Sequence, residues 1–169
     1  MNKIYLRTLF TILIIGISLS SCKKDKTGTD LIVGNWTAGT PTFTAMIGTK
    51  TITQYFTDVM GLTADVALQY TTIFNLGVQQ AFVGTINFKS DNTYTSNLGG
   101  TPDSGTWSLS ADGKTLTITP TGDTPSTATV TQLTSNKLVV SLTDTVSEDL
   151  NSDGTPETII VTGTLPFTK

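Results

Sequence analysis

From about residue 85 to the end of the chain, apolar and polar residues alternate with a period of two. The apolar members of this alternation are Ile86 and Phe88, Trp107 and Leu109, Leu116 and Ile118, Ala128 and Val130, Leu138, Val140 and Leu142, and Ile159 and Val161. This period is typical of strands that bury one face and expose the other. Threonine occupies many of the intervening positions, so we expect a sheet with one apolar face and one hydroxyl-rich face.

Short turn signals separate these segments. They are Ser90-Asp91-Asn92, Ala111-Asp112-Gly113-Lys114, Thr121-Gly122-Asp123 and Ser135-Asn136. Connections of this length join antiparallel neighbours and are too short for parallel crossovers. We therefore predict a mainly all-β fold, an antiparallel meander of about eight strands. Such a meander removes its open edges by closing into a barrel, and a two-sheet sandwich is the alternative.

The segment from 50 to 82 departs from this alternation and predicts two short helices, inserted after the first strand. Helical spacing relates Ile52, Tyr55, Phe56, Val59 and Met60, and the pattern stops at Gly61. A second helix is predicted to begin after Thr63 as its N-cap, with apolar positions Val66, Leu68, Tyr70, Ile73, Phe74 and Val78.

These helices have two possible roles. They either complete a small core or form a lid over a ligand cavity at the mouth of the barrel. The candidate residues for the cavity or its lid are Tyr55, Phe56, Tyr70, Phe74 and Trp107. An eight-stranded barrel is just wide enough to be packed with side chains or to hold one small ligand, so both roles stay open.

The N-terminal segment predicts a lipoprotein signal peptide, residues 1–21. Lys3 and Arg7 precede the apolar stretch 9–17, which is too short to cross about 30 Å of hydrocarbon. Leu19-Ser20-Ser21-Cys22 resembles the lipobox of bacterial lipoproteins. This resemblance implies cleavage before Cys22 and a membrane anchor of acyl chains on its sulfur. The lysine that follows implies the outer membrane, with residues 22–30 as a tether and 31–169 as one domain.

Composition excludes several classes of function. The 169 residues include 36 threonines, no histidine and one cysteine, with a net charge of −3. A single cysteine leaves no disulfide within the chain. Without histidine there is no Ser-His-Asp triad and no ordinary zinc site. Acidic residues outnumber basic ones, so nucleic acid is not expected as a partner.

The start of the predicted domain and two later strings resemble a known family. Gly34-Asn35-Trp36 resembles the Gly-x-Trp signature of lipocalins, and 88–95 and 105–118 are similar to lipocalin-like lipoproteins of some Gram-negative bacteria. The resemblance implies a calycin-type barrel, with Gly34 and Trp36 as the barrel-closing signature and Trp36 packed across the closed end. The paired helices depart from lipocalins and look more like the portal helices of fatty-acid-binding proteins.

One acidic loop has the spacing of a calcium site. Asp149, Asn151 and Asp153 stand at positions 1, 3 and 5, and a glycine follows at position 6. Thr155 could add its carbonyl and Glu157 a water-mediated contact, although Ile160 occupies the position of the usual bidentate glutamate. Calcium is therefore the one candidate cofactor. The alternative is an acidic loop stabilised by Asx turns.

The function expected from these features is binding rather than catalysis. A carboxylate pair for glycoside hydrolysis could be drawn from 144, 148, 149, 153 and 157, but a solvated or metal-binding loop explains this clustering better. We expect a barrel that binds a small apolar molecule, since no arginine follows Arg7 to hold a fatty-acid carboxylate. The alternative is a non-enzymatic module with a packed barrel, which contacts a protein or glycan at the cell envelope.

Overall fold

The computed structural model describes residues 28–169, so the predicted signal peptide and Cys22 lie outside the described residues. The helices are α1 (Gly28–Ile32), α2 (Ile52–Asp58) and α3 (Ala64–Gln80). The strands are β1 (Gly34–Ala38), β2 (Thr42–Ile47), β3 (Lys50–Thr51), β4 (Gly84–Phe88), β5 (Thr93–Leu98), β6 (Thr101–Leu109), β7 (Thr115–Pro120), β8 (Ser126–Leu133), β9 (Lys137–Glu148) and β10 (Glu157–Thr168). No helix within this range is long and apolar enough to cross a membrane.

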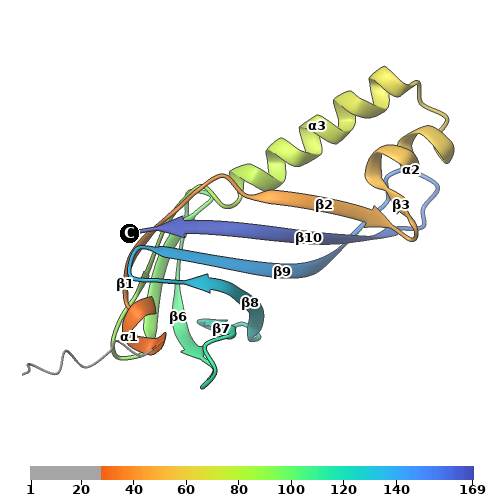
Figure 1. The fold of residues 1–169 in the computed structure, drawn as a ribbon. Coiled ribbons are helices and arrows are strands. Elements are labelled where there is room, and N and C mark those ends of the chain that lie inside the picture. The colour runs from red at the N-terminus through yellow and green to blue at the C-terminus, as the bar shows by residue number, and fades with distance from the viewer. Residues whose placement is uncertain (1–27) are drawn as a thin grey trace, which may run out of the picture.

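Eight of these strands close into an antiparallel barrel. Their order is β1-β4-β5-β6-β7-β8-β9-β10, and β10 pairs back with β1 (Figure 1). The six alternating segments of the sequence are β4 and β6–β10, and most of their apolar side chains are buried. The predicted all-β barrel is therefore confirmed, and the two-sheet sandwich is excluded. The core of the barrel includes Trp36, Phe88, Tyr94 and Leu138.

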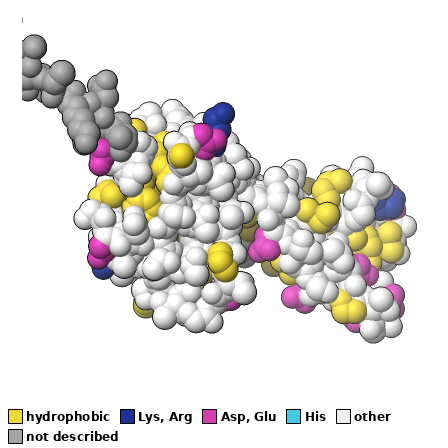
Figure 2. All heavy atoms as spheres, turned by 90° about the horizontal axis from the view of Figure 1, so that it is seen from below, with side chains coloured by type: hydrophobic (Ala, Val, Ile, Leu, Met, Phe, Trp, Pro, Cys, Tyr) yellow, Lys and Arg dark blue, Asp and Glu magenta, His cyan; other side chains and the backbone are white. Residues whose placement is uncertain are grey.

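Strand β10 has two successive partners along one of its edges. Phe167 and Thr168 pair with β1, whereas 159–164 pair with β2. On its other edge, β10 pairs with β9 along its whole length. Strands β2, β9 and β10 therefore continue past the barrel as a ribbon, and α2 and α3 pack on it (Figure 1). We call this extension of the sheet, together with β3, α2 and α3, the arm. It forms a second lobe beside the barrel in Figure 2.

The arm has its own core, on which the two inserted helices pack. Tyr55 and Phe56 of α2 and Ala67 of α3 are buried against Ile159 and Val161 of β10. The helices follow three strands rather than one, because β2 and β3 come before them. Helix α2 begins where predicted from its spacing, since Thr51 forms a capping box with Gln54.

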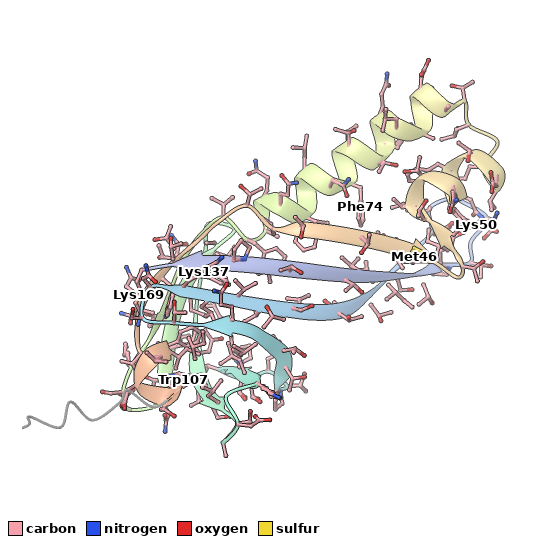
Figure 3. The ribbon with its side chains drawn as sticks, in the orientation of Figure 1. Met46, Lys50, Phe74, Trp107, Lys137 and Lys169 are labelled. Carbon is pink, nitrogen blue, oxygen red and sulfur yellow. The ribbon has the colours of Figure 1, made fainter. Side chains whose placement is uncertain are left out.

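The buried face of α3 differs from the predicted one. Ala67 is fully buried and Phe74 packs on the core of the arm (Figure 3). Leu68, Tyr70 and Ile73 are instead 60%, 53% and 66% exposed. The helix is apolar on more than one side, so its periodicity alone does not identify the face that the sheet covers.

Helix α1 covers the closed end of the barrel. It spans Gly28–Ile32 and ends two residues before β1, which starts at Gly34. Trp36 is fully buried, and its Nε1 donates a hydrogen bond to the carbonyl of Ile32 at 2.6 Å. Trp36 thus fastens the helix to the barrel wall.

Lys169 also holds this helix, and it lies over the face of the indole ring. Its ammonium donates to the carbonyls of Leu31 and Val33, each at 2.7 Å, and lies 4.4 Å from the ring centroid of Trp36. Gly34 has a φ of 138°, and a Cβ there would lie 2.8 Å from Cε of Lys169. A glycine at this position therefore lets the lysine reach the end of α1.

We expect Lys169→Met to lower the free energy of unfolding by about 1 kcal/mol, because it removes two hydrogen bonds and a cation–π contact. Urea denaturation followed by tryptophan fluorescence measures this loss. Lys114→Met is the matched control, since the Lys114 side chain has no hydrogen bond to the rest of residues 28–169. Equal stability of the two variants would contradict the role given to Lys169.

Candidate functional site

The barrel contains a cavity of about 510 Å³. Its walls are mainly aliphatic and aromatic side chains from β4, β7, β8, β9 and β10. The lining residues are Phe82, Ile86, Phe88, Leu98, Leu116, Ile118, Ser126, Thr127, Ala128, Leu138, Val140, Leu142, Thr143, Asp144, Leu165 and Phe167. This volume lies within the range of about 300–1,000 Å³ that is typical of small-molecule sites. The interior is therefore large enough for one small ligand.

The polar part of this lining lies where two strands separate. Strands β8 and β9 pair only as far as Thr129 and Ser141. Beyond that point 126–128 continue beside β7, whereas 142–144 continue beside β10 into the arm. Ser126, Thr127, Thr143 and Asp144 belong to these diverging segments and line the cavity. The cavity thus has apolar walls and a polar border along the gap between β8 and β9.

Most of the predicted lid residues lie away from this cavity. Tyr55 and Phe56 are buried in the core of the arm, and Phe74 packs against that core. Tyr70 is half exposed and its ring centroid lies 5.8 Å from that of Phe56. None of these four residues lines the cavity. The ribbon of β2, β9 and β10 extends beyond the barrel and offers the helices an apolar face there.

Phe82, which follows α3, is the aromatic residue of the insert that lines the cavity. Its ring centroid is 5.6 Å from that of Phe43, which packs against both cores. Phe43 in turn lies over Gly163, where a Cβ would come within 2.5 Å of the ring. The close approach requires glycine, so the junction between barrel and arm depends on this position.

Trp107 lies toward the closed end of the barrel and not at the cavity (Figure 3). Its Nε1 donates to the carbonyl of Lys89 at 3.1 Å, and its ring packs edge-on against Phe88 at a centroid distance of 5.5 Å. Gly34 and Trp36 also lie at this end. None of the residues predicted for the cavity or its lid therefore lines it. Its apolar walls come instead from the alternating positions of the predicted strands, such as Ile86, Leu116 and Val140.

Tyr94 is a buried polar residue that the sequence does not reveal. Its hydroxyl donates to Oδ2 of Asp103 at 2.5 Å, diagonally across the paired strands β5 and β6. Burial, together with the nearby Asp103 carboxylate, raises the pKa of Tyr94 well above its ordinary value. Tyr94 faces Gly105 across the two strands, so its ring covers a position without a side chain. This pair is a structural element of the barrel wall.

The acidic loop between β9 and β10 is a hydrogen-bonded turn that contacts α2. Asp149 accepts the N–H groups of Asp153 and Gly154 at 3.2 and 3.0 Å. The side chain of Asn151 bonds to Asp153, whose Oδ1 accepts the N–H of Thr155 at 2.8 Å. Backbone and side-chain donors in the loop lower the pKa of Asp153. The loop is thus shaped by Asx-type bonds.

Glu157 connects this loop to the arm. One of its carboxylate oxygens accepts the hydroxyl of Tyr55, and the other accepts the N–H of Leu150 at 2.8 Å. These two donors, the tyrosine first, lower the pKa of Glu157 below its ordinary value. The same bond to Glu157, followed by burial, raises the pKa of Tyr55. Both shifts favour the hydrogen-bonded, ionised carboxylate.

No group of three or more acidic, histidine or cysteine side chains in residues 28–169 is placed to hold a metal ion. The loop residues from Asp149 to Glu157 lie near one another, but their oxygens accept hydrogen bonds from the protein. Calcium binding by this loop stays a prediction from the sequence alone.

Comparison with known proteins identifies one matching family. A family model described as a lipocalin-like domain matches residues 32–140. Among solved structures, a duf4847 family protein from Bacteroides vulgatus is similar over 82% of this chain and 93% of that chain, with 18% sequence identity and a TM-score of 0.39. The comparison with curated proteins finds no match. The matched residues run from the end of α1 into β9.

The bond between Tyr55 and Glu157 predicts a pH-dependent stability of the arm. The folded pKa of Glu157 is lower than its ordinary value of 4.5. The bond therefore stabilises the fold above about pH 4.5, and its contribution is lost as the pH falls through the lowered folded value. Urea denaturation at pH values from 3 to 7 should show a smaller acid loss for Glu157→Gln and for Tyr55→Phe than for the unchanged chain.

Glu148→Gln is the control for this prediction. Glu148 lies opposite Glu157 in the β9–β10 ladder but does not bond to Tyr55, so this variant should keep the full acid loss. If Glu157→Gln loses as much stability on acidification as the unchanged chain, the bond does not produce the pH dependence.

Proposed function

Because the chain belongs to the family of lipocalin-like domains, we propose that it is a binding protein that takes up a small apolar molecule inside its barrel. Lipocalin-like domains are generally binding folds rather than enzymes. The observation that carries the proposal is the cavity of about 510 Å³ with walls of aliphatic and aromatic side chains. Burial of apolar ligand surface there contributes roughly 25 cal/mol per Å².

The side chains around the cavity favour binding over catalysis. The chain has no histidine, and its single cysteine is Cys22, so histidine-based nucleophile–base pairs and cysteine nucleophiles are absent from residues 28–169. Asp144 lines the cavity without a second carboxylate in the lining. Glycoside hydrolysis by two acids requires such a pair on both sides of the bond to be cleaved. We infer that the protein binds its ligand without catalysing a reaction.

We further propose that the protein is a lipoprotein of the bacterial outer membrane, anchored through acyl chains on Cys22. Helix α1 begins at Gly28, six residues after Cys22. Six residues reach at most about 20 Å, so the anchor would hold the closed end of the barrel near the lipid surface. The gap between β8 and β9 lies on the side away from α1, and would face the aqueous compartment.

A second candidate function is a contact surface for a protein or glycan partner on the arm. Leu68, Tyr70, Ile73 and Leu76 of α3 are each more than half exposed. Exposed apolar side chains gathered on one element are typical of interaction sites. The two functions are compatible, but only the first one uses the cavity.

The first function predicts saturable binding that a side chain can block. A neutral fluorescent apolar dye should bind the processed chain with one site, and Ala128→Trp should weaken this binding at least tenfold, because Ala128 lines the cavity and the indole would occupy it. Thr129→Trp is the matched control, since Thr129 is exposed and its side chain points to the other face of β8. Non-saturable binding, or equal binding by both variants, would favour the contact surface instead.

The anchor makes a separate prediction. Mass spectrometry of the protein purified from outer membranes should find a chain that starts at residue 22 with acyl chains on its cysteine. Cys22→Ser should leave the signal peptide uncleaved and remove these chains. Recovery of the unchanged protein with Met1 present and an unmodified thiol would contradict the anchor without affecting the cavity.

A further inference from the structure

The border of the cavity carries a negative charge that the protein does not neutralise. Asp144 is the one charged residue in the lining. It shares the inward face of β9 with Val140 and Leu142, because side chains alternate along a strand. Its Oδ1 accepts the N–H of Thr145 at 2.8 Å, and it forms no ion pair within residues 28–169. The carboxylate can therefore accept further hydrogen bonds from a ligand.

The lysines of the described chain lie elsewhere. Residues 28–169 contain five lysines and no arginine. Lys89, Lys114, Lys137 and Lys169 all adjoin strand ends at the closed end of the barrel. Lys50 lies at the tip of the arm, where its ammonium is 2.6 Å from Asp58. Figure 3 shows Lys137 and Lys169 at one end of the molecule and Lys50 at the other.

The open end of the barrel adds further negative charge. Asp103 lies near the start of β6, and Asp123 lies in the turn between β7 and β8. Both strand ends are on the side of the barrel opposite α1. On the face seen in Figure 2, an acidic side chain and no basic one lies at the junction between the barrel and the arm. The field at the opening therefore attracts cations and repels anions.

The negative charge at the cavity and the lack of a lysine or arginine beside it determine which polar group an apolar ligand can carry. A carboxylate or phosphate would meet Asp144 and would find no positive side chain beside it. An ammonium group has three donors and no acceptor, which suits the carboxylate of Asp144 and the hydroxyl of Ser126, which shares the inward face of β8 with Ala128. The apolar body of the same molecule would lie against the walls of the cavity.

We propose that the ligand is a cationic amphiphile, an apolar molecule whose amine end binds Asp144 at the gap between β8 and β9. The inference rests on the proposed function, because it concerns the same cavity. It goes beyond apolar binding in that it fixes which end of the molecule lies at the border and which charge that end carries.

The test compares ligands of one length with different ends. The protein is the chain from residue 22 onward, with Cys22→Ser, and it is first loaded with the neutral dye. Dodecylamine, dodecanol or dodecanoate is then added at micromolar concentration and pH 7, and displacement of the dye is measured. We expect the amine to bind at least tenfold more tightly than the carboxylate, with the alcohol between them. The preference should shrink at 1 M salt, because the gap is open to solvent.

The variant Asp144→Asn tests whether Asp144 is the residue that recognises the charged end of the ligand. This variant should bind the amine no more tightly than the alcohol, while its affinity for dodecanol stays within twofold. Asp123→Asn is the control, because Asp123 lies at the same end but outside the lining, and it should keep most of the preference. Equal affinity for the three ligands, tighter binding of the carboxylate, or an unchanged preference in Asp144→Asn would overturn this inference and leave the apolar cavity standing. Failure of all three ligands to displace the dye would overturn the proposed function as well.

Discussion

Both lobes of the molecule depend on the hydrogen bonding of β10 to two successive partners on one edge. Strands β1 and β2 follow one another along this edge. In the segment that joins them, the N–H of Gly39 donates to the carbonyl of Pro166 at 2.8 Å. Strand β1 also pairs with β4 and so closes the barrel, whereas β2 turns outward into the arm. A single long strand thus belongs to a closed sheet at one end and to an open ribbon at the other. The cavity and the helical insert are both placed by this division.

The helical insert consequently supports the ribbon rather than covering the barrel. A ribbon of three strands with one apolar face needs a partner layer, and α2 and α3 supply it through Phe56, Ala67 and Phe74. The two cores meet at Phe43, whose ring lies over Gly163 and beside Phe82. A displacement of the insert would reach the cavity through Phe82, since this residue both follows α3 and lines the cavity. Phe82 therefore connects the arm to the wall of the cavity.

The sequence predicts the helices and strands of this fold better than it predicts what each of them packs against. Pairs such as Ile86 with Phe88, or Trp107 with Leu109, identify strands because a period of two has one structural meaning. The spacing of Tyr55 and Phe56 likewise identifies α2. Periodicity identifies the buried side of the strands and of α2, but not that of α3, and it never identifies the layer that covers this side. Tyr55 and Phe74 were therefore expected at a lid and lie in the arm. Asp144 was visible only as one member of an acidic cluster, because its place at the cavity depends on where β9 leaves β8, and no local signal marks Ser141 as the last paired residue.

The separation of β9 from β8 also has a consequence for solubility. Beyond Ser141, β9 forms the outer edge of the ribbon, with backbone donors and acceptors that could add a strand from another molecule. Asp144 and Glu148 stand on this edge, and in two apposed copies their like charges would oppose each other. The carboxylates of β9 would then guard against polymerisation of the protein through this exposed edge.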